Sequence, residues 1–276
     1  MTVPLSAPFP DGHQPADPDL GLRFDRTAED YHRLRPRYPT HVIDALIGGA
    51  ALHPGDRVLE LGAGTGIATR ALAERGLAVT ALEPGPAMAA IARRELAPFP
   101  RVSVIESTFE AWTPPGGTPP FDLVLAATAF HWLDRATRLD RIASYLRPGG
   151  HLAILQYQHA AGGDEAFFAK AQACYLRWMP GASPNESLPA WNAPPDTGEI
   201  DAHPAFQLAV VQQWREIVPS TTQDYLALLG TYSGHIALDP VRRAGLLGCI
   251  GDLIDGEFGG QIAKAYRYEL ILARRP

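Results

Sequence analysis

The stretch RVLELGAGTG, Arg57–Gly66, decides the fold of this 276-residue chain. The run VLEL is short and apolar, as expected of a buried strand, and three glycines follow it at alternate positions, Gly62, Gly64 and Gly66. The next residues, IATRALAERG, carry alanine and leucine at helical spacing. We therefore predict a strand, a tight glycine turn and a helix in succession, an arrangement that lets bare backbone approach a ligand.

The regions around this stretch alternate between strand and helix patterns. Strands are predicted at 57–61, 78–83, 102–106, 121–127, 151–157, 208–217 and 266–273, and helices at 66–75, 86–96, 134–146, 165–178, 222–230 and 239–255. Thr40 and Asp134 are expected to cap helices, and Pro86 suits a first helical turn. Because parallel strands need crossover helices, the order predicts a doubly wound, mostly parallel, seven-stranded Rossmann-like α/β sheet with helices on both faces.

The same patterns divide the chain into four predicted segments. Residues 1–22 are rich in Pro, Asp and Gly and are expected to form a flexible leader. Residues 23–158 form the predicted core with N-terminal cap helices, and residues 159–205 a lid inserted after the fifth strand. Residues 206–276 are then expected to complete the sheet.

The composition of the chain limits the kinds of partner that it can bind. A net charge of −6 disfavours a nucleic-acid partner, which requires a basic face. No apolar stretch approaches the ~18 residues that span a bilayer, and the N-terminus lacks the pattern of a signal peptide. Cys174 and Cys249 lie in apolar helical contexts without a C-x-x-C spacing, which predicts buried free thiols rather than a disulfide. We expect a cytoplasmic protein without membrane contact, either a monomer or a weak homodimer.

The spacing of the glycines distinguishes between two kinds of cofactor. A dinucleotide fingerprint places its third small residue three positions after the second glycine, where this chain has Ile67. The form E-x-G-x-G-x-G instead resembles motif I of the class I S-adenosylmethionine (SAM) dependent methyltransferases. The resemblance implies that the glycine turn binds SAM and that Glu60 faces the cationic end of the cofactor.

The remaining cofactor contacts are predicted from the ends of the later strands. Glu83, about twenty residues past the first glycine, is placed to accept hydrogen bonds from both ribose hydroxyls. Thr108 stands where relatives commonly carry an Asp toward the adenine amino group, and Ala126 and Ala127 leave room for the methionine portion. The predicted cofactor-binding residues are Glu60, Gly62, Ala63, Gly64, Thr65, Gly66, Glu83, Pro84, Met88, Thr108, Phe109, Ala126 and Ala127.

Residues 24–158 resemble the type 11 group of these methyltransferases. The pairing of YHRLRPRYP near the front with FHWLD in the middle is similar to trans-aconitate-methyltransferase-like enzymes, and TYSGH near the end fits the same subgroup. The motifs are specific for the class of cofactor, whereas none is specific for a substrate.

Three side chains are candidates for action on the substrate. His131 follows the fourth strand, at the edge where open α/β sheets bind ligands. It is expected either to act as a base or to pack with Trp132 in a purely structural role. Tyr31 and Arg35 are placed to reach the methionine carboxylate or an anionic acceptor, or else belong to a solvated basic turn. Tyr232, Ser233 and His235 are expected at a junction that closes the substrate pocket or serves only structure.

The predicted function is transfer of a methyl group from SAM to a hydroxyl or carboxylate oxygen of a small molecule, with S-adenosyl-L-homocysteine (SAH) as product and no metal. The alternative is a catalytically silent SAM-binding sensor or partner protein. An N-P-P-Y-type motif for methylation of amino groups is absent after the fourth strand, where AATA stands at 126–129. A nicotinamide-dependent oxidoreductase is disfavoured by Ile67.

Overall fold

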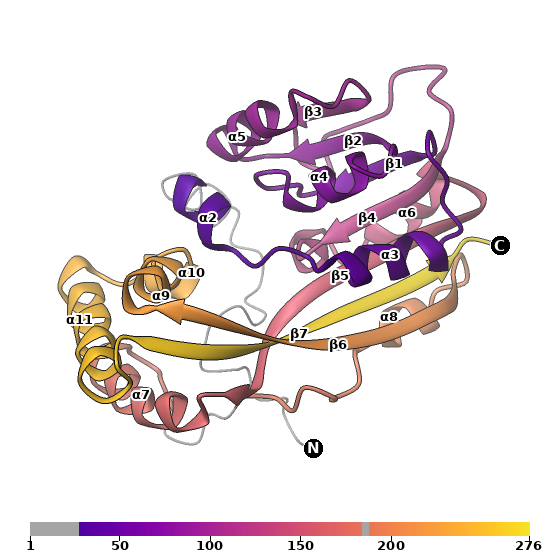
Figure 1. Ribbon diagram of the computed structural model, residues 1–276. Helices are drawn as coiled ribbons and strands as arrows, with labels where there is room; N and C mark the ends of the chain where they lie inside the picture. Colours follow the sequence, from indigo (N-terminus) through magenta and orange to yellow (C-terminus); the bar gives the residue numbers. More distant parts are fainter. Residues whose placement is uncertain (1–27, 184–187) are drawn as a thin grey trace. The chain divides into compact units, whose positions relative to one another are not determined.

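The computed structural model describes residues 28–183 and 188–276 (Figure 1). The predicted flexible leader at 1–22 lies outside the described residues. The chain divides into two compact units. The glycine-turn unit comprises Pro36–Tyr157, Pro194–Trp214 and Tyr268–Pro276, and the helical unit comprises the described parts of the chain up to Arg35, of Gln158–Ala193 and of Arg215–Arg267. The predicted segment boundaries stay a prediction.

One sheet of seven strands runs in the order β3-β2-β1-β4-β5-β7-β6. Its strands are β1 (Arg57–Leu61), β2 (Ala78–Glu83), β3 (Val102–Glu106), β4 (Phe121–Ala127), β5 (Leu146–Gly163), β6 (Gln207–Thr221) and β7 (Gln261–Arg274). The pairs β1–β2, β1–β4, β2–β3 and β4–β5 are parallel. The predicted fold class, a mostly parallel Rossmann-like sheet of seven strands, is confirmed.

The helices follow the predicted order with small shifts at their ends. They are α2 (Ala28–Leu34), α3 (Thr40–Gly49), α4 (Ile67–Ala73), α5 (Pro86–Leu96), α6 (Arg138–Tyr145), α7 (Glu165–Trp178), α8 (Gly198–Asp201), α9 (Thr222–Leu229), α10 (Ser233–Ile236) and α11 (Pro240–Glu257), with a 3₁₀ turn, η2, at Phe130–Trp132. None of the helices in the described ranges is both long and apolar enough to cross a membrane.

Two predicted helix caps are wrong. Thr40 is the first residue of α3, and Pro39 occupies the cap position without a capping side chain. Asp134 stands before a turn instead of a helix, because its carboxylate accepts hydrogen bonds from the Ala136 amide and the Thr137 hydroxyl. This local bonding competes with helix formation, so α6 begins only at Arg138.

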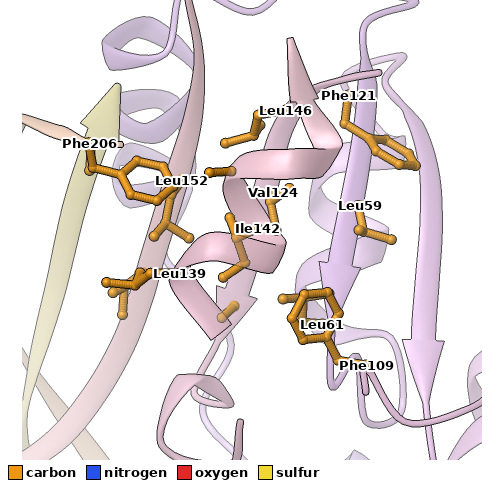
Figure 2. Packing of buried hydrophobic residues seen from close by; sticks show 14 of the residues in the cluster. Leu59, Leu61, Phe109, Phe121, Val124, Leu139, Ile142, Leu146, Leu152 and Phe206 are labelled. Carbon is orange, nitrogen blue, oxygen red and sulfur yellow. The ribbon is translucent and has the colours of Figure 1, made fainter. Parts of the chain in front are cut away.

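The core of the glycine-turn unit lies between α6 and the central strands (Figure 2). Leu139 and Ile142 of α6 belong to one buried cluster with Leu59 of β1 and Val124 of β4. Trp112 also belongs to this cluster, and its ring lies 6.4 Å from that of Phe121. The central strands are therefore buried by their helices, as a parallel sheet requires.

The helical unit has its own core of apolar and aromatic side chains from α7, α9 and α11. A disulfide joins Cys174 of α7 to Cys249 of α11, which lie side by side (Figure 1). The prediction of two free thiols is therefore wrong. Two cysteines 75 residues apart give no sequence signal for pairing, because only the packing of α7 on α11 brings them together.

The last three strands are longer than predicted. β5 continues to Gly163 and so includes the sequence HAAGG that follows its apolar pattern. Gly163 has φ +71°, and a Cβ there would lie 2.2 Å from the Ala263 carbonyl oxygen. The glycine permits this close approach of two backbones, so a residue that indicates a strand end in the sequence instead allows pairing.

Candidate cofactor-binding site

The glycine turn after β1 has the left-handed backbone that its sequence predicts. Gly62, Gly64 and Gly66 have φ of 66°, 58° and 82°. Packing also requires glycine at two of these positions, since a Cβ at Gly62 would lie 2.8 Å from the Ala129 Cβ and one at Gly66 would lie 2.8 Å from Leu96 Cδ1. The turn therefore passes through space that admits no side chain and presents its backbone to whatever lies beside it.

Glu83, at the end of β2, is bonded to the glycine turn. Its Oε2 accepts a hydrogen bond from the Gly64 amide at 2.7 Å, and its Oε1 accepts one from the Gly85 amide at 2.7 Å. The residue is 8% exposed. A carboxylate has about four acceptor positions, so one carboxylate can bond to backbone amides and to ligand hydroxyls at the same time, and these two bonds fix its orientation. The predicted ribose contact fits this geometry.

Glu60, near the end of β1, is almost completely buried at 1% exposure. Its Oε2 accepts a hydrogen bond of 2.6 Å from the Thr69 hydroxyl in α4, whereas its Oε1 has no hydrogen-bond partner in the described part of the chain. Burial raises the pKa of this carboxyl to about 8; the hydrogen bond from Thr69 opposes the rise and the nearby Glu83 adds to it. A buried oxygen without a partner is the kind of group that a ligand cation satisfies.

The other predicted cofactor residues of the turn and of α5 lie at or near these two carboxylates. Ala63 donates its amide to the Leu82 carbonyl, which ties the turn to β2. The Thr65 side chain is 1% exposed, and within the described ranges its hydroxyl has no hydrogen-bond partner. Pro84 and Met88 follow Glu83 toward and into α5, where Met88 is buried.

The predicted residues after β3 and at the end of β4 are less clearly available to a ligand. The Thr108 hydroxyl accepts a hydrogen bond of 3.1 Å from the Ala111 amide, so it already stabilises its own turn. Phe109 is buried in the core, with its ring 6.0 Å from that of Tyr145. Ala126 is fully buried in the same core, while Ala127 is half-buried. Their proposed roles therefore depend on backbone and size rather than on free polar groups.

Sequence reasoning missed Tyr38 and Thr128. Thr128 follows β4 with φ +55°, an uncommon value for a β-branched residue. Its hydroxyl is 2.8 Å from the Tyr38 hydroxyl, and the Tyr38 ring packs against Tyr157 and Tyr268. The tyrosines supply the contacts that hold the strained turn, and no local pattern indicates this, because the residues come from separate parts of the chain.

The three candidate catalytic residues do not all fall in one unit. His131 is half-buried in η2 of the glycine-turn unit, with its ring 4.7 Å from that of Trp132. Tyr31 and Arg35 lie together in the helical unit, where the Arg35 guanidinium is 4.8 Å from the Tyr31 ring. Arg35 is 6% exposed and donates to the hydroxyl and carbonyl oxygens of Thr231. It is thus a buried side chain, not a residue of a solvated basic turn.

A buried polar cluster surrounds Tyr232 in the helical unit. Its hydroxyl is 2.9 Å from His159 Nε2 and accepts from Lys264 at 3.3 Å, while the Arg35 guanidinium lies 4.7 Å from its ring. His235 is 3.2 Å from the Tyr175 hydroxyl. Burial and the neighbouring cations hold the pKa of His159 well below its ordinary value and lower that of His235 to about 3. The two imidazoles are therefore neutral at pH 7, and positive charge resides on Arg35 and Lys264.

The strand order is typical of the class I methyltransferase fold, and the glycine turn with its two buried carboxylates is a candidate cofactor site. Residues 58–150 match the family described as methyltransferase domain. This part of the chain is therefore similar to a methyltransferase domain, in agreement with the predicted enzyme class and cofactor, and the activity of the whole chain is a proposal. The trans-aconitate-like subgroup stays a prediction.

Curated relatives agree with this class over part of their length. An uncharacterised methyltransferase of Mycobacterium tuberculosis is 41% identical over 137 residues, which are 50% of this chain and 53% of the relative. A biotin biosynthesis bifunctional protein of Bordetella avium is 36% identical over 143 residues, 50% of this chain and 30% of the relative. The chain spans about half the length of the first of these relatives and less of the second.

Solved structures support the fold alone. A protein from Anaeromyxobacter dehalogenans, described as a type II methyltransferase, aligns with a TM-score of 0.60 at 24% identity over 87% of this chain and 97% of that one. A SAM-dependent methyltransferase from Thiobacillus denitrificans in complex with SAH aligns with a TM-score of 0.51 at 14% identity, covering 91% of this chain and 97% of that one.

Proposed function

We propose that this chain transfers a methyl group from SAM to an oxygen atom, hydroxyl or carboxylate, of a small molecule and releases SAH. The observation that carries the proposal is the pair of buried carboxylates beside the glycine turn. Glu83 is fixed by the Gly64 amide, and Glu60 keeps an oxygen without a partner in the described part of the chain. This pair matches two features of SAM: its ribose diol, which nucleotides share, and its cationic amino-acid end, which they lack.

The residues of the glycine-turn unit fit this cofactor. Glu83 would hold the ribose, the backbone of Gly62–Gly66 would face the methionine portion, and Glu60 would balance positive charge. When bound, SAM supplies an activated methyl group on a sulfonium, which needs alignment with the acceptor more than acid or base chemistry. The protein's task is therefore to position both molecules and to exclude water.

The type of acceptor oxygen decides whether the reaction needs a base. A carboxylate acceptor needs no general base at pH 7, whereas a hydroxyl acceptor would need one, for which His131 is the candidate.

The relatives leave the acceptor open. One of them is named for biotin biosynthesis, and another, 28% identical over 174 residues, is a demethylmenaquinone methyltransferase of Tropheryma whipplei. These names imply different acceptors, so the acceptor class rests on this chain's own residues. The competing function is a SAM-binding sensor without turnover, which the glycine turn would serve equally well.

The decisive experiment has two stages. Isothermal titration measures binding of SAM, SAH and NAD, and we expect the first two to bind and NAD to fail. Methyl transfer is then followed with isotope-labelled SAM against matched pairs of acids and primary alcohols with the same carbon skeletons. Absence of SAH binding by the wild-type protein would contradict the whole proposal. Tight SAH binding with no turnover on any acceptor would favour the sensor.

The candidate base has its own test. His131→Phe keeps an aromatic ring beside Trp132 and removes the imidazole nitrogens. We expect this variant to lower kcat for alcohol acceptors at least about tenfold and to leave kcat for acids and the affinity for SAH unchanged. An equal loss for acids and alcohols would show that His131 supports structure rather than proton transfer.

The partners and location of the chain are also proposals. A small-molecule acceptor, no nucleic acid and a monomer or weak homodimer are consistent with the net charge of −6. The proposed cytoplasmic location conflicts with the Cys174–Cys249 disulfide, since such bonds persist in oxidising compartments. Thiol labelling of the protein in intact cells decides between the two: labelled cysteines support the cytoplasm, and protected ones an oxidising compartment.

A further inference from the structure

Glu60 and Thr69 form a buried pair that spans the glycine turn. We propose that Thr69 is a positioning residue for the cofactor: its hydroxyl holds one oxygen of Glu60, the other oxygen receives the cationic end of the cofactor, and binding there expels a proton from the carboxyl. The inference rests on the proposed cofactor site and goes beyond it in naming Thr69 and the proton.

The geometry assigns each atom a separate task. Glu60 lies two residues before Gly62, and Thr69 lies three residues after Gly66, within the first turn of α4. The Thr69 Oγ1 donates to Glu60 Oε2 at 2.6 Å, so one carboxyl oxygen is fixed from the far side of the turn. Oε1 is buried and has no hydrogen-bond partner among the described residues. A buried acceptor left open beside a ligand site is costly unless a ligand group uses it.

The presence of threonine at position 69 indicates that its hydroxyl has a role beyond packing. The buried residues of α4 are Ala68, Thr69, Leu72 and Ala73, so Thr69 is the one hydroxyl on an otherwise apolar face. Thr69 is fully buried at 0% exposure. Valine has nearly the same shape and would pack equally well, which means that packing alone does not explain the hydroxyl.

The charge state of Glu60 makes the proposed binding depend on pH. Its pKa of about 8 means that the neutral carboxyl predominates at pH 7 before any ligand binds. Among the described residues, the charged group that acts on it is Glu83, whose negative charge also favours the neutral form. A cation placed against Oε1 favours the carboxylate, so the carboxyl O–H bond breaks and the proton passes to solvent. Binding and proton release are thereby linked.

The test measures protons rather than turnover. SAH is titrated into the wild-type protein by calorimetry at pH 7 in phosphate and in Tris, whose ionisation enthalpies differ, and the difference in heat gives the protons released. We expect close to one proton for the wild type and none for Glu60→Gln. Between pH 6 and 7.5, wild-type affinity should rise about tenfold per pH unit, while that of Glu60→Gln stays flat. The amino group of SAH contributes equally to both and cancels.

Thr69→Val and Thr69→Ser isolate the hydroxyl. Without the hydrogen bond from Thr69 the carboxylate is harder to form, so Thr69→Val should bind SAH about tenfold more weakly at pH 7, with its pH profile displaced upward by about one unit. Thr69→Ser keeps the donor and should stay within threefold of the wild type. Thr80→Val removes a hydroxyl from β2 at a position that pairs with Leu59 rather than with Glu60; it is the control and should change neither value.

The outcomes separate this inference from the proposed function. Binding of SAH by the wild type without proton release overturns the inference alone. If Thr69→Val and Thr69→Ser bind SAH with equal affinity and equal pH profiles, the positioning role of Thr69 is wrong, whether or not Glu60 titrates. If the wild type binds no SAH at any pH, the proposed cofactor site fails and the inference fails with it.

Discussion

The two carboxylates beside the glycine turn and the cluster around Tyr232 are buried polar sites that are assembled in different ways. In the glycine-turn unit, Glu60 and Glu83 bond to groups within twenty residues along the chain, 9 and 19 positions away. In the helical unit, Arg35 bonds to Thr231, 196 positions away, and Lys264 to Tyr232, 32 positions away. A cofactor site built from local sequence leaves a motif, whereas a polar cluster assembled from distant elements leaves none.

The largest expected effect concerns the disulfide and should stay within the helical unit. The double variant Cys174→Ala/Cys249→Ala opens a loop of 75 residues, which in a chain-entropy model lowers the free energy of unfolding by about 4 kcal/mol. Urea unfolding, with hydrogen exchange of α7 and α11 amides, measures the loss. SAH affinity, a property of the other unit, should be unchanged.

Reduction of the wild type by dithiothreitol is the matched control for that variant. Reduced wild type and double variant should unfold at the same urea concentration. An unfolding midpoint that does not respond to reduction would show that the two thiols are unpaired in solution, and the sequence-based prediction of free thiols would then be restored.

Gly64→Asp should give the next largest effect, this time in the glycine-turn unit. Gly64 has φ +58° and donates its amide to Glu83, so the variant strains the backbone and places a second carboxylate beside the first. We expect a loss of SAH affinity of at least about 100-fold, about 2.7 kcal/mol. Isothermal titration measures it.

Gly117→Asp provides the control for backbone strain. Gly117 has φ +81°, and a Cβ there meets nothing within 4 Å. This variant should lose a little stability and bind SAH normally. A similar loss of affinity in both variants would mean that Gly64→Asp acts through general destabilisation rather than through the site.

Glu83→Ala should have a smaller effect than Gly64→Asp. It removes two acceptors from backbone amides and the proposed contacts with the ribose, which predicts a loss of SAH affinity of about 10- to 100-fold from hydrogen bonds to a charged group. Glu106→Ala is the control, because Glu106 pairs with Glu83 in register at the end of β3 but is exposed. Equal affinities of the two variants would contradict a ligand role for Glu83.

The last expected effect is a gain of stability in Glu60→Gln that is absent at low pH and grows as pH rises. The pKa of Glu60 is raised to about 8 in the folded protein, so the wild type is most favoured at low pH, where the carboxyl is neutral in both states. As pH rises from about 4.5 to 8, Glu60 loses its proton in the unfolded chain but keeps it in the folded protein, which lowers the free energy of unfolding of the wild type.

Thermal unfolding of Glu60→Gln and wild type measures this difference. The variant should gain roughly a few °C in Tm relative to the wild type between pH 5 and pH 8, in the absence of ligand. Glu106→Gln, exposed at the next strand end, should show no such trend. A constant difference across this range would show that Glu60 is charged in the folded protein.

Much of the glycine-turn unit could be predicted from sequence. The bounds of β1 to β4 and of α5 agree with the predicted ranges, as do those of α7 in the helical unit, because apolar runs, Gly and Pro act within a few residues of themselves. The errors have local or tertiary causes. Asp134 bonds to its own turn rather than capping a helix, and Gly163 permits strand pairing where it suggested an end.

The sequence alone determined the class of fold and of cofactor, since a strand followed by Gly62, Gly64 and Gly66 dictates a backbone that few other arrangements need. Tertiary structure decided the rest. It paired Cys174 with Cys249 and gathered Arg35, Lys264 and Tyr232 into one cluster. The reason is physical: backbone conformation is set by neighbours along the chain, whereas the environment of a buried charge is set by whichever side chains the packing brings to it.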